Sequence, residues 1–311
     1  MMTVFDRTFD RPWLGAGVAI PLFAASLVCA MSFAADAAVA AEDASKWDGD
    51  ARNAARLIAG APVAGSAMPI RAGIEIRLQA GWHTYWRYPG DAGVPPRFDF
   101  TGSQNVKSVD VLWPAPQAIP EQGLTAIGYT ANLIWPLAIV PHDRAKPVTL
   151  RLKLDYAVCE KLCVPAEAKL ELALNGKGSR LSSAQGLLSQ TSSPQEAALI
   201  AAEARVPKKV ALGEGATLAV RSVRRENGTP HARVVVDVAA PAGTRVTLLA
   251  EGPGPDWALP VPTPIDGAPA GLKRFAFDLD GAPPGAKYDG AAIRLTAVAD
   301  DEAIEVVTHL D

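Results

Sequence analysis

The chain from Val148 to Leu174 reads VTLRLKLDYAVCEKLCVPAEAKLELAL, and this stretch decides the fold of the first half of the protein. Residues 148–158 and 168–174 are strand candidates, and Cys159 and Cys163 lie between them, four residues apart. On one straight strand these cysteines would be about 13 Å apart, whereas the Cα atoms of a disulfide lie about 4.4–6.8 Å apart. A disulfide therefore requires a turn at 160–162, which predicts a hairpin with one cysteine on each strand.

The cysteine pair has two interpretations that the residues alone leave open. The chain has three cysteines, and the third, Cys29, lies in the segment that we expect to be removed on export. A lone close pair in an exported protein is either a structural disulfide or a redox-active dithiol. The ring that it closes is short, so its entropic contribution to stability is limited.

Metal binding and hydrolysis are weaker alternatives. Two thiolates with His83 and His142 could form a tetrahedral zinc site or a softer copper site. However, C-x3-C is not the usual zinc spacing, and neither histidine is near the cysteines in sequence. The chain also has no G-x-S-x-G and no H-E-x-x-H motif. We therefore expect no metal and no cofactor.

The rest of the first half also reads as strands. Residues 70–78 alternate apolar and polar side chains, as a half-buried strand does, and 81–86 are aromatic and β-branched. Residues 89–96 contain three prolines and two glycines, which predicts a loop. With further strand candidates at 106–113 and 133–140, the spacing predicts an immunoglobulin-like β-sandwich over residues 41–175.

The second half is predicted to contain a linker and a second sandwich. Residues 176–206 form the expected linker, with a short helix from Pro194 to about Arg205, because Ser193 can cap it and Glu196 follows three residues later. A second, smaller β-sandwich is expected over 207–311. Its strand candidates are 217–223, 232–238, 245–250, 273–279 and 291–298. The predicted fold class is all-β.

The N-terminus predicts export. Arg7 and Arg11 precede an apolar segment at 13–33, and Ala38-Val-Ala40 fits a signal cleavage site. We therefore expect a signal peptide over 1–40 and a mature protein that is soluble in the periplasm, where disulfides persist. The formal net charge of −3 gives no basic surface for nucleic acid, so we expect no such partner.

Four segments carry a resemblance to a known family. They are Gly81–Pro96, Val111–Pro116, Ile127–Tyr129 and Asp155–Glu167. Together they resemble the N-terminal periplasmic domain of DsbD-type thiol:disulfide interchange proteins, and are most similar to the branch that includes the suppressor-of-copper-sensitivity B proteins. The resemblance covers about residues 46–175 and extends weakly into the second β-domain.

The resemblance implies a redox role for the cysteines. In that family an immunoglobulin-like sandwich carries a pair that takes electrons from a membrane-embedded domain and passes them to thioredoxin-like periplasmic proteins. Carried over, Cys159 and Cys163 are the redox pair, and the second cysteine is the one attacked. Family members cover the pair with a cap loop, which would correspond here to Glu121, Gln122, Gly123 and Leu124.

The chain also departs from the full-length reductases. It has neither their multi-spanning membrane domain nor their C-terminal thioredoxin domain, so we expect the electron donor to be a separate membrane protein. The resemblance then implies a component of a protein-disulfide oxidoreductase. Two alternatives remain: a non-enzymatic periplasmic binding or scaffold module with a structural disulfide, and metal handling related to copper stress.

Overall fold

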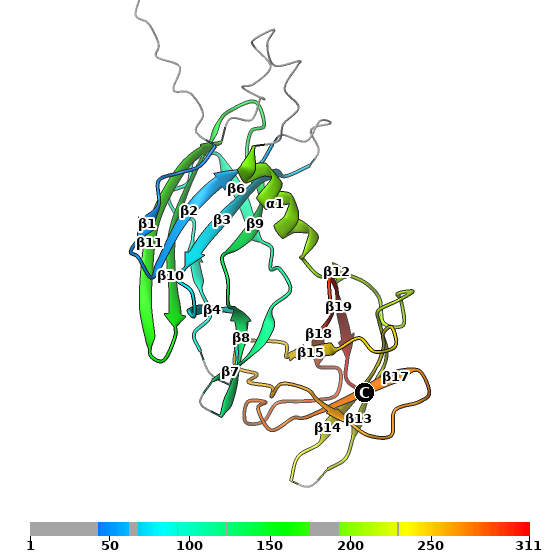
Figure 1. Ribbon diagram of the computed structural model, residues 1–311. Helices are drawn as coiled ribbons and strands as arrows, with labels where there is room; N and C mark the ends of the chain where they lie inside the picture. The colour runs from blue at the N-terminus through cyan, green and yellow to red at the C-terminus, as the bar shows by residue number, and fades with distance from the viewer. Residues whose placement is uncertain (1–42, 62–67, 92, 122, 175–192, 229) are drawn as a thin grey trace, which may run out of the picture. The chain divides into compact units, whose positions relative to one another are not determined.

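The computed structural model describes residues 43–61, 68–91, 93–121, 123–174, 193–228 and 230–311. The expected signal peptide and residues 176–192 of the expected linker lie outside this part of the chain. The described residues form β-strands and a single helix (Figure 1), so the all-β prediction is confirmed. Within them, no helix has the length and apolar character that crossing a bilayer requires.

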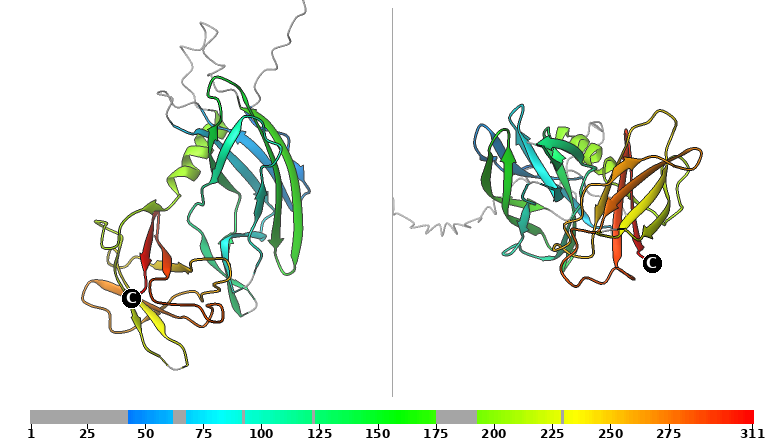
Figure 2. Two further views of the ribbon diagram at one scale, coloured as in Figure 1. Left: turned by 180° about the vertical axis from the view of Figure 1, so that it is seen from behind. Right: turned by 90° about the horizontal axis from the view of Figure 1, so that it is seen from below.

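The strands that precede the helix form two antiparallel sheets. Their bounds are β1 Asp48–Gly49, β2 Asn53–Ala59, β3 Ile70–Leu78, β4 His83–Gly90, β5 Arg97–Asp99, β6 Val106–Val111, β7 Gln117–Glu121, β8 Leu124–Tyr129, β9 Leu133–Pro141, β10 Val148–Cys159 and β11 Cys163–Leu174. One sheet has the order β1-β2-β3-β9-β6 and the other β11-β10-β4-β8-β7, with β5 paired to β10. Figure 2 shows the long β10–β11 hairpin, in green, from behind.

A single hydrophobic cluster joins these two sheets into a sandwich. Ile74 on β3 and Trp135 on β9 enter it from one sheet, and Trp86 on β4 and Leu154 on β10 enter it from the other. All four side chains are fully buried. The strand predicted at 70–78 is observed with those bounds, because its alternating apolar residues point to the core face.

The helix α1, Pro194–Ala204, forms where its capping sequence predicts. The Ser193 side chain accepts a hydrogen bond from the backbone N–H of Glu196, and the proline occupies the first turn. Leu199 is buried against the first sheet, and Arg71 on β3 makes an ion pair with Glu196 at 2.7 Å. The helix is therefore fixed to the sandwich by both apolar and charged contacts.

The strands that follow the helix form two further sheets around a second core. Their bounds are β12 Lys208–Lys209, β13 Ala219–Glu226, β14 Arg233–Ala239, β15 Val246–Glu251, β16 Thr263–Ile265, β17 Leu272–Asp278, β18 Ala292–Ala299 and β19 Glu302–His309. The sheet orders are β12-β19-β18-β15 and β13-β14-β17-β16. Val236 on β14 and Leu295 on β18 are among the fully buried residues that join them.

The proposed domain boundaries, with sandwiches over 41–175 and 207–311, stay a prediction. Residues Ala40–Asp311 form one compact unit. Within it, Arg87 on β4 makes ion pairs with Glu251 on β15 at 2.7 Å and with Glu305 on β19 at 2.6 Å. The strands that follow the helix, β12 to β19, form the second block of strands, and this block is therefore in contact with β4.

One loop prediction is partly wrong. Strand β4 continues through Pro89 and Gly90, and Gly90 pairs with Ala126 on β8. The pairing of β4 with β8 is irregular between Tyr85 and Gly90, so no ladder hydrogen bond is needed from the proline nitrogen. A proline is tolerated in this strand because it lies at the irregularity.

Candidate functional site

The two cysteines close the end of the β10–β11 hairpin. Cys159 is the last residue of β10, Cys163 is the first of β11, and the two are register partners with Cα atoms 4.2 Å apart. Their sulfur atoms are joined in a disulfide. The turn predicted at 160–162 is therefore present, and it makes the pair a feature of the hairpin tip.

The two halves of the disulfide differ in exposure. Cys159 is 1% exposed and packs with Tyr85, Ala126 and Ala157, whereas Cys163 is an exposed residue at the start of its strand. Leu162, immediately before Cys163, is 76% exposed. An incoming thiolate can therefore reach Cys163 far more easily than Cys159.

Tyr85 is the side chain in closest polar contact with the disulfide. Its hydroxyl lies 2.7 Å from Cys159 Sγ and 3.1 Å from Cys163 Sγ. Disulfide sulfurs carry no proton, so the tyrosine hydroxyl is the donor. Its single proton can be donated to Cys159 Sγ or to Glu121 Oε2, which is 3.4 Å away, and Cys159 Sγ is the nearer acceptor.

The environment of Tyr85 keeps its hydroxyl protonated. Burial, followed by the negative charge of Glu121, raises the pKa of Tyr85 to about 12. The backbone of Gly93 packs against the tyrosine ring and restricts its position. Gly93 has φ +116°, and a Cβ at this residue would lie 2.3 Å from the ring. Tyr85 is therefore a fixed hydrogen-bond donor at neutral pH.

Glu121 and His83 complete the surroundings of the sulfurs. The Glu121 carboxylate has one oxygen 3.6 Å from Cys163 Sγ and the other 3.4 Å from the Tyr85 hydroxyl. His83 is the register partner of Cys159 across the β4–β10 pairing, and its Nε2 lies 3.5 Å from Glu121 Oε2. A carboxylate and an imidazole therefore lie beside a disulfide.

The residues that the resemblance assigned to a cap loop lie on the β7–β8 hairpin. Glu121 ends β7 and reaches the disulfide, as described above. Gly123 is in the turn with φ +88°, and Leu124 begins β8 and is 50% exposed. Gln122 lies outside the described residues. The segment is thus the end of a hairpin, and of its described residues Glu121 contacts the sulfurs.

Sequence reasoning missed Tyr85 and gave His83 only as a remote metal ligand. The available signal was the spacing of the two residues, because residues i and i+2 of a strand share a face. His83 and Tyr85 do pack together, with ring centroids 5.4 Å apart, while Trp86 faces the sandwich core. His142, the other histidine considered as a metal ligand, lies just after β9, where its backbone N–H donates to the carbonyl of Asn105. Among the described residues, the potential metal ligands that gather at the disulfide are His83, Glu121 and Cys159, and His142 is not one of them.

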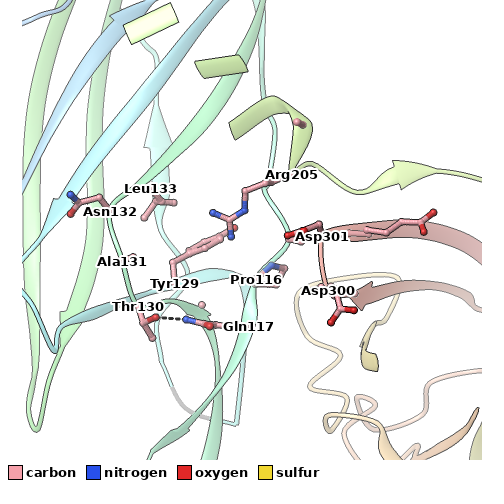
Figure 3. Close-up of a pocket in the computed structure, with 16 residues that line it drawn as sticks. Pro116, Gln117, Tyr129, Thr130, Ala131, Asn132, Leu133, Arg205, Asp300 and Asp301 are labelled. Atoms are coloured by element: carbon pink, nitrogen blue, oxygen red, sulfur yellow. Dashed lines mark hydrogen bonds between the residues drawn. The ribbon is translucent and has the colours of Figure 1, made fainter. Parts of the chain in front are cut away.

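A separate pocket has a volume of about 540 Å³ (Figure 3). It is lined by residues 128–133 and by Arg205, Asp300 and Asp301, among others. Neither cysteine lines it, and neither do Tyr85 or Glu121. The disulfide is therefore not part of this pocket.

Comparisons with known proteins connect this site to a family. Residues 56–175 match the sequence model of the family described as thiol:disulfide interchange protein DsbD, N-terminal. No curated protein sequence shows significant similarity to the chain. The crystal structure of the N-terminal periplasmic domain of ScsB from Proteus mirabilis superposes with a TM-score of 0.64 at 20% identity, covering 86% of this chain and 98% of that chain.

The structural match shows a shared fold that extends beyond the family match into the second block of strands. At the level of the family, the sequence match together with the Cys159–Cys163 disulfide supports thiol–disulfide exchange. The resemblance noted in the sequence is confirmed. Residues 56–175 are similar in sequence to the N-terminal domain of the DsbD family.

Proposed function

We propose that this protein relays electrons in the periplasm through Cys159 and Cys163, from a separate membrane electron-transfer protein to thioredoxin-like partners. The observation that carries the proposal is the unequal exposure of the pair: Cys163 is exposed and Cys159 is 1% exposed. Thiol–disulfide exchange requires one sulfur that a partner can attack and another that can leave and later resolve the mixed disulfide.

Loading of the pair starts at Cys163. A donor thiolate attacks Cys163 Sγ, the bond between Cys163 and Cys159 breaks, and the sulfur of Cys159 leaves with the electron pair. The Tyr85 hydroxyl, 2.7 Å away, donates a hydrogen bond to this leaving thiolate. The second thiolate of the donor then attacks the donor sulfur of the mixed disulfide and releases Cys163. The donor becomes a disulfide, and the pair gains two electrons and two protons.

Delivery runs through the same bonds in reverse. The Cys163 thiolate attacks the disulfide of a thioredoxin-like acceptor, and a mixed disulfide forms at Cys163. Cys159 then attacks Cys163 Sγ, which restores the internal disulfide and releases the acceptor in its dithiol form. The proximity of Cys159, its register partner, favours this resolution over attack by solvent thiols.

The surface around the disulfide supports docking of a protein. Three exposed apolar residues lie in the segments that meet there: Val94, Leu124 and Leu162, which are 54%, 50% and 76% exposed. Leu162 precedes Cys163, and Leu124 is the register partner of Glu121. Val94 follows Gly93, whose backbone packs against the Tyr85 ring. Exposed apolar groups around a reactive group are typical of a transient interface.

A trapping experiment tests the relay. The partner is a thioredoxin-like protein that keeps only its exposed active-site cysteine, activated as a mixed disulfide with Ellman's reagent. Cys159→Ser retains the exposed Cys163 and should form a stable covalent complex with it. Cys163→Ser retains only the buried Cys159 and should form the complex much more slowly. Equal yields from the two variants, or no complex from either, would contradict the proposal.

The alternative of a structural disulfide predicts a different result. If the pair serves stability alone, the oxidised protein should not exchange with any thioredoxin-like dithiol, and removal of the disulfide should unfold the protein. Measurement of the reduction potential against glutathione separates the two cases, because structural disulfides in secreted proteins lie below about −300 mV.

A further inference from the structure

The disulfide lies within a set of side chains that can bind metal ions. One ligand atom each from His83, Glu121 and Cys159 can be chosen so that all three lie within 4.8 Å of one another. Cys163 Sγ is bonded to Cys159 Sγ and lies 3.6 Å from Glu121. One imidazole, one carboxylate and two sulfurs therefore converge from four strands: β4, β7, β10 and β11.

His83 provides an independent indication of a ligand at this position. The residue is 6% exposed, and its Nε2 is buried with no hydrogen-bond partner among the described residues. Nε2 does lie 3.5 Å from Glu121 Oε2, but the geometry does not make a hydrogen bond. A buried polar atom without a hydrogen-bond partner lowers the stability of the folded state, so its presence in a native structure requires a physical explanation. A metal ion between Nε2 and the carboxylate would supply its missing partner.

In the oxidised protein the sulfurs are poor ligands because they are bonded to each other. Reduction by a dithiol or a phosphine adds two electrons and two protons, breaks the S–S bond and leaves two thiols. Around a tetrahedral zinc ion, ligand atoms of these types lie about 3.4–3.8 Å apart. His83 Nε2 lies 3.5 Å from Glu121 Oε2, and Cys163 Sγ lies 3.6 Å from the other carboxylate oxygen, Oε1. Each distance is within this range, so the carboxylate faces both the imidazole and the sulfur at a spacing that a zinc ion can bridge.

We propose that the reduced protein binds one Zn²⁺ ion through the thiolates of Cys159 and Cys163, the imidazole of His83 and the carboxylate of Glu121. The mixed sulfur, nitrogen and oxygen donor set favours zinc over Cu⁺, which prefers thiolates and does not favour carboxylate. Binding releases the two thiol protons. When the disulfide of an acceptor takes two electrons from the pair, the S–S bond forms again, the acceptor becomes a dithiol, and the ion is released. Tyr85 lies outside this set and donates to a metal-bound thiolate, as groups around a metal site commonly do.

This inference goes beyond the relay, because it requires only that the disulfide be reducible and does not depend on the identity of a partner. It also departs from the expectation drawn from the sequence. There, a metal site made of the two cysteines with His83 and His142 was considered as an alternative, and no metal was expected. In the structure the oxygen ligand Glu121, rather than His142, meets His83 at the sulfurs.

Metal titration of the full chain tests the site. The protein is reduced with a phosphine under anaerobic conditions, freed of reductant and metal, and titrated with Co²⁺ as a spectroscopic substitute for zinc. We expect one equivalent to bind, with thiolate-to-cobalt charge-transfer and tetrahedral d–d bands, and to be displaced by Zn²⁺. The oxidised protein should bind none.

Three variants separate this site from simple chelation by two thiols. His83→Ala and Glu121→Gln should each weaken zinc binding by at least about tenfold. His142→Ala is the matched control and should bind like the wild type. Circular dichroism and recovery of the disulfide on oxidation check that His83→Ala folds, and Glu121→Gln provides a second test that removes only the charge.

Four results would overturn the proposal. They are no cobalt or zinc uptake by the reduced protein, equal uptake by the oxidised protein, wild-type affinity in both His83→Ala and Glu121→Gln, and uptake of Cu⁺ without Zn²⁺. The thiol-exchange measurements proposed above are made without metal, so failure of the zinc site and failure of the relay are distinguishable.

Discussion

The hydroxyl of Tyr85 lies 2.7 Å from the sulfur of Cys159, although the two residues are 74 positions apart in the chain. The contact arises because β4 and β10 pair side by side at the register His83–Cys159 and Thr84–Val158. It places a protonated hydroxyl against the sulfur that is buried and that leaves when the exposed sulfur is attacked. The reactivity of the disulfide should therefore depend on Tyr85.

Removing this hydroxyl should slow reduction of the disulfide. A hydrogen bond to a charged group contributes about 1.5–3 kcal/mol, so Tyr85→Phe should reduce the rate roughly ten- to a hundredfold. The rate is measured by stopped-flow fluorescence or by quenched alkylation with a dithiol reductant. Tyr88→Phe is the control, because the Tyr88 hydroxyl donates to the carbonyl of Leu259 rather than to a sulfur. A rate for Tyr85→Phe within twofold of the wild type would exclude the role given to the hydroxyl.

The Gly93 backbone should control the position of Tyr85. A Cβ at Gly93 would lie 2.3 Å from the tyrosine ring, so Gly93→Ala should displace the ring and slow disulfide reduction as well as lower the melting temperature. Gly243→Ala is the matched control: its φ is +80°, and nothing lies within 4 Å of the added Cβ. Both variants place an alanine at a positive φ, which costs about 1–3 kcal/mol. Only Gly93→Ala should also change the exchange rate, and similar rates in the two variants would contradict the packing argument.

Loss of the disulfide should leave the protein folded. The ring between Cys159 and Cys163 is so short that the chain-entropy estimate of its stabilisation is about 2 kcal/mol. The double variant Cys159→Ser, Cys163→Ser should therefore unfold cooperatively in urea, with a modestly lower midpoint than the oxidised wild type. The reduced wild type is the control and should resemble the double variant. Unfolding of the double variant in buffer alone would show that the pair is structural.

An acidic group in the second block of strands should make the stability depend on pH. Asp237 is 3% exposed, and hydrogen bonds, above all from Arg274 at 2.7 Å, lower its pKa from 3.8 to about 2. A folded pKa below the unfolded pKa means that the carboxylate stabilises the fold above about pH 5. This contribution, roughly 2 kcal/mol, is lost as the pH falls toward 2.

Asp237→Asn checks this interpretation. It should destabilise the protein by about 2 kcal/mol at neutral pH, because Arg224 and Arg274 lose their charged partner, and it should flatten the acid dependence of urea unfolding. Asp289→Asn is the control, since Asp289 also pairs with an arginine, Arg225, but is 81% exposed. A loss of stability in acid that is the same in Asp237→Asn as in the wild type would assign the pH dependence to other groups.

The sequence by itself determined the local elements. The strand at 70–78 follows from its period of two, the helix at 194–204 from its cap and proline, and the hairpin from the spacing of Cys159 and Cys163. These signals depend only on neighbours within a few residues, and the elements that they predict form in the structure. The fold class and the family resemblance followed from the same kind of local evidence.

Strands with weak local signals were missed. Residues 53–59, 117–121, 124–129 and 302–309 form strands in the structure but were not predicted as strands. In the structure β2 pairs with β3, β7 with β8, β8 with β4, and β19 with β18, and this pairing supplies backbone hydrogen bonds that the composition of these segments does not predict. Since β-propensity depends strongly on the packing of neighbouring strands, tertiary pairing decided these elements.

Only the tertiary structure decided the chemistry at the cysteines. His83, Tyr85 and Glu121 meet the sulfurs because β4, β7 and β10 are brought together by sheet pairing, across separations of 36 to 78 residues. The same packing buries Cys159 and leaves Cys163 exposed, although both have similar neighbours in sequence. The family resemblance had named Cys163 as the attacked cysteine and had placed Glu121 in a loop over the pair. The burial of Cys159 and the contacts of His83 and Tyr85 with this site are properties of the folded sheet, so they became visible only in the structure.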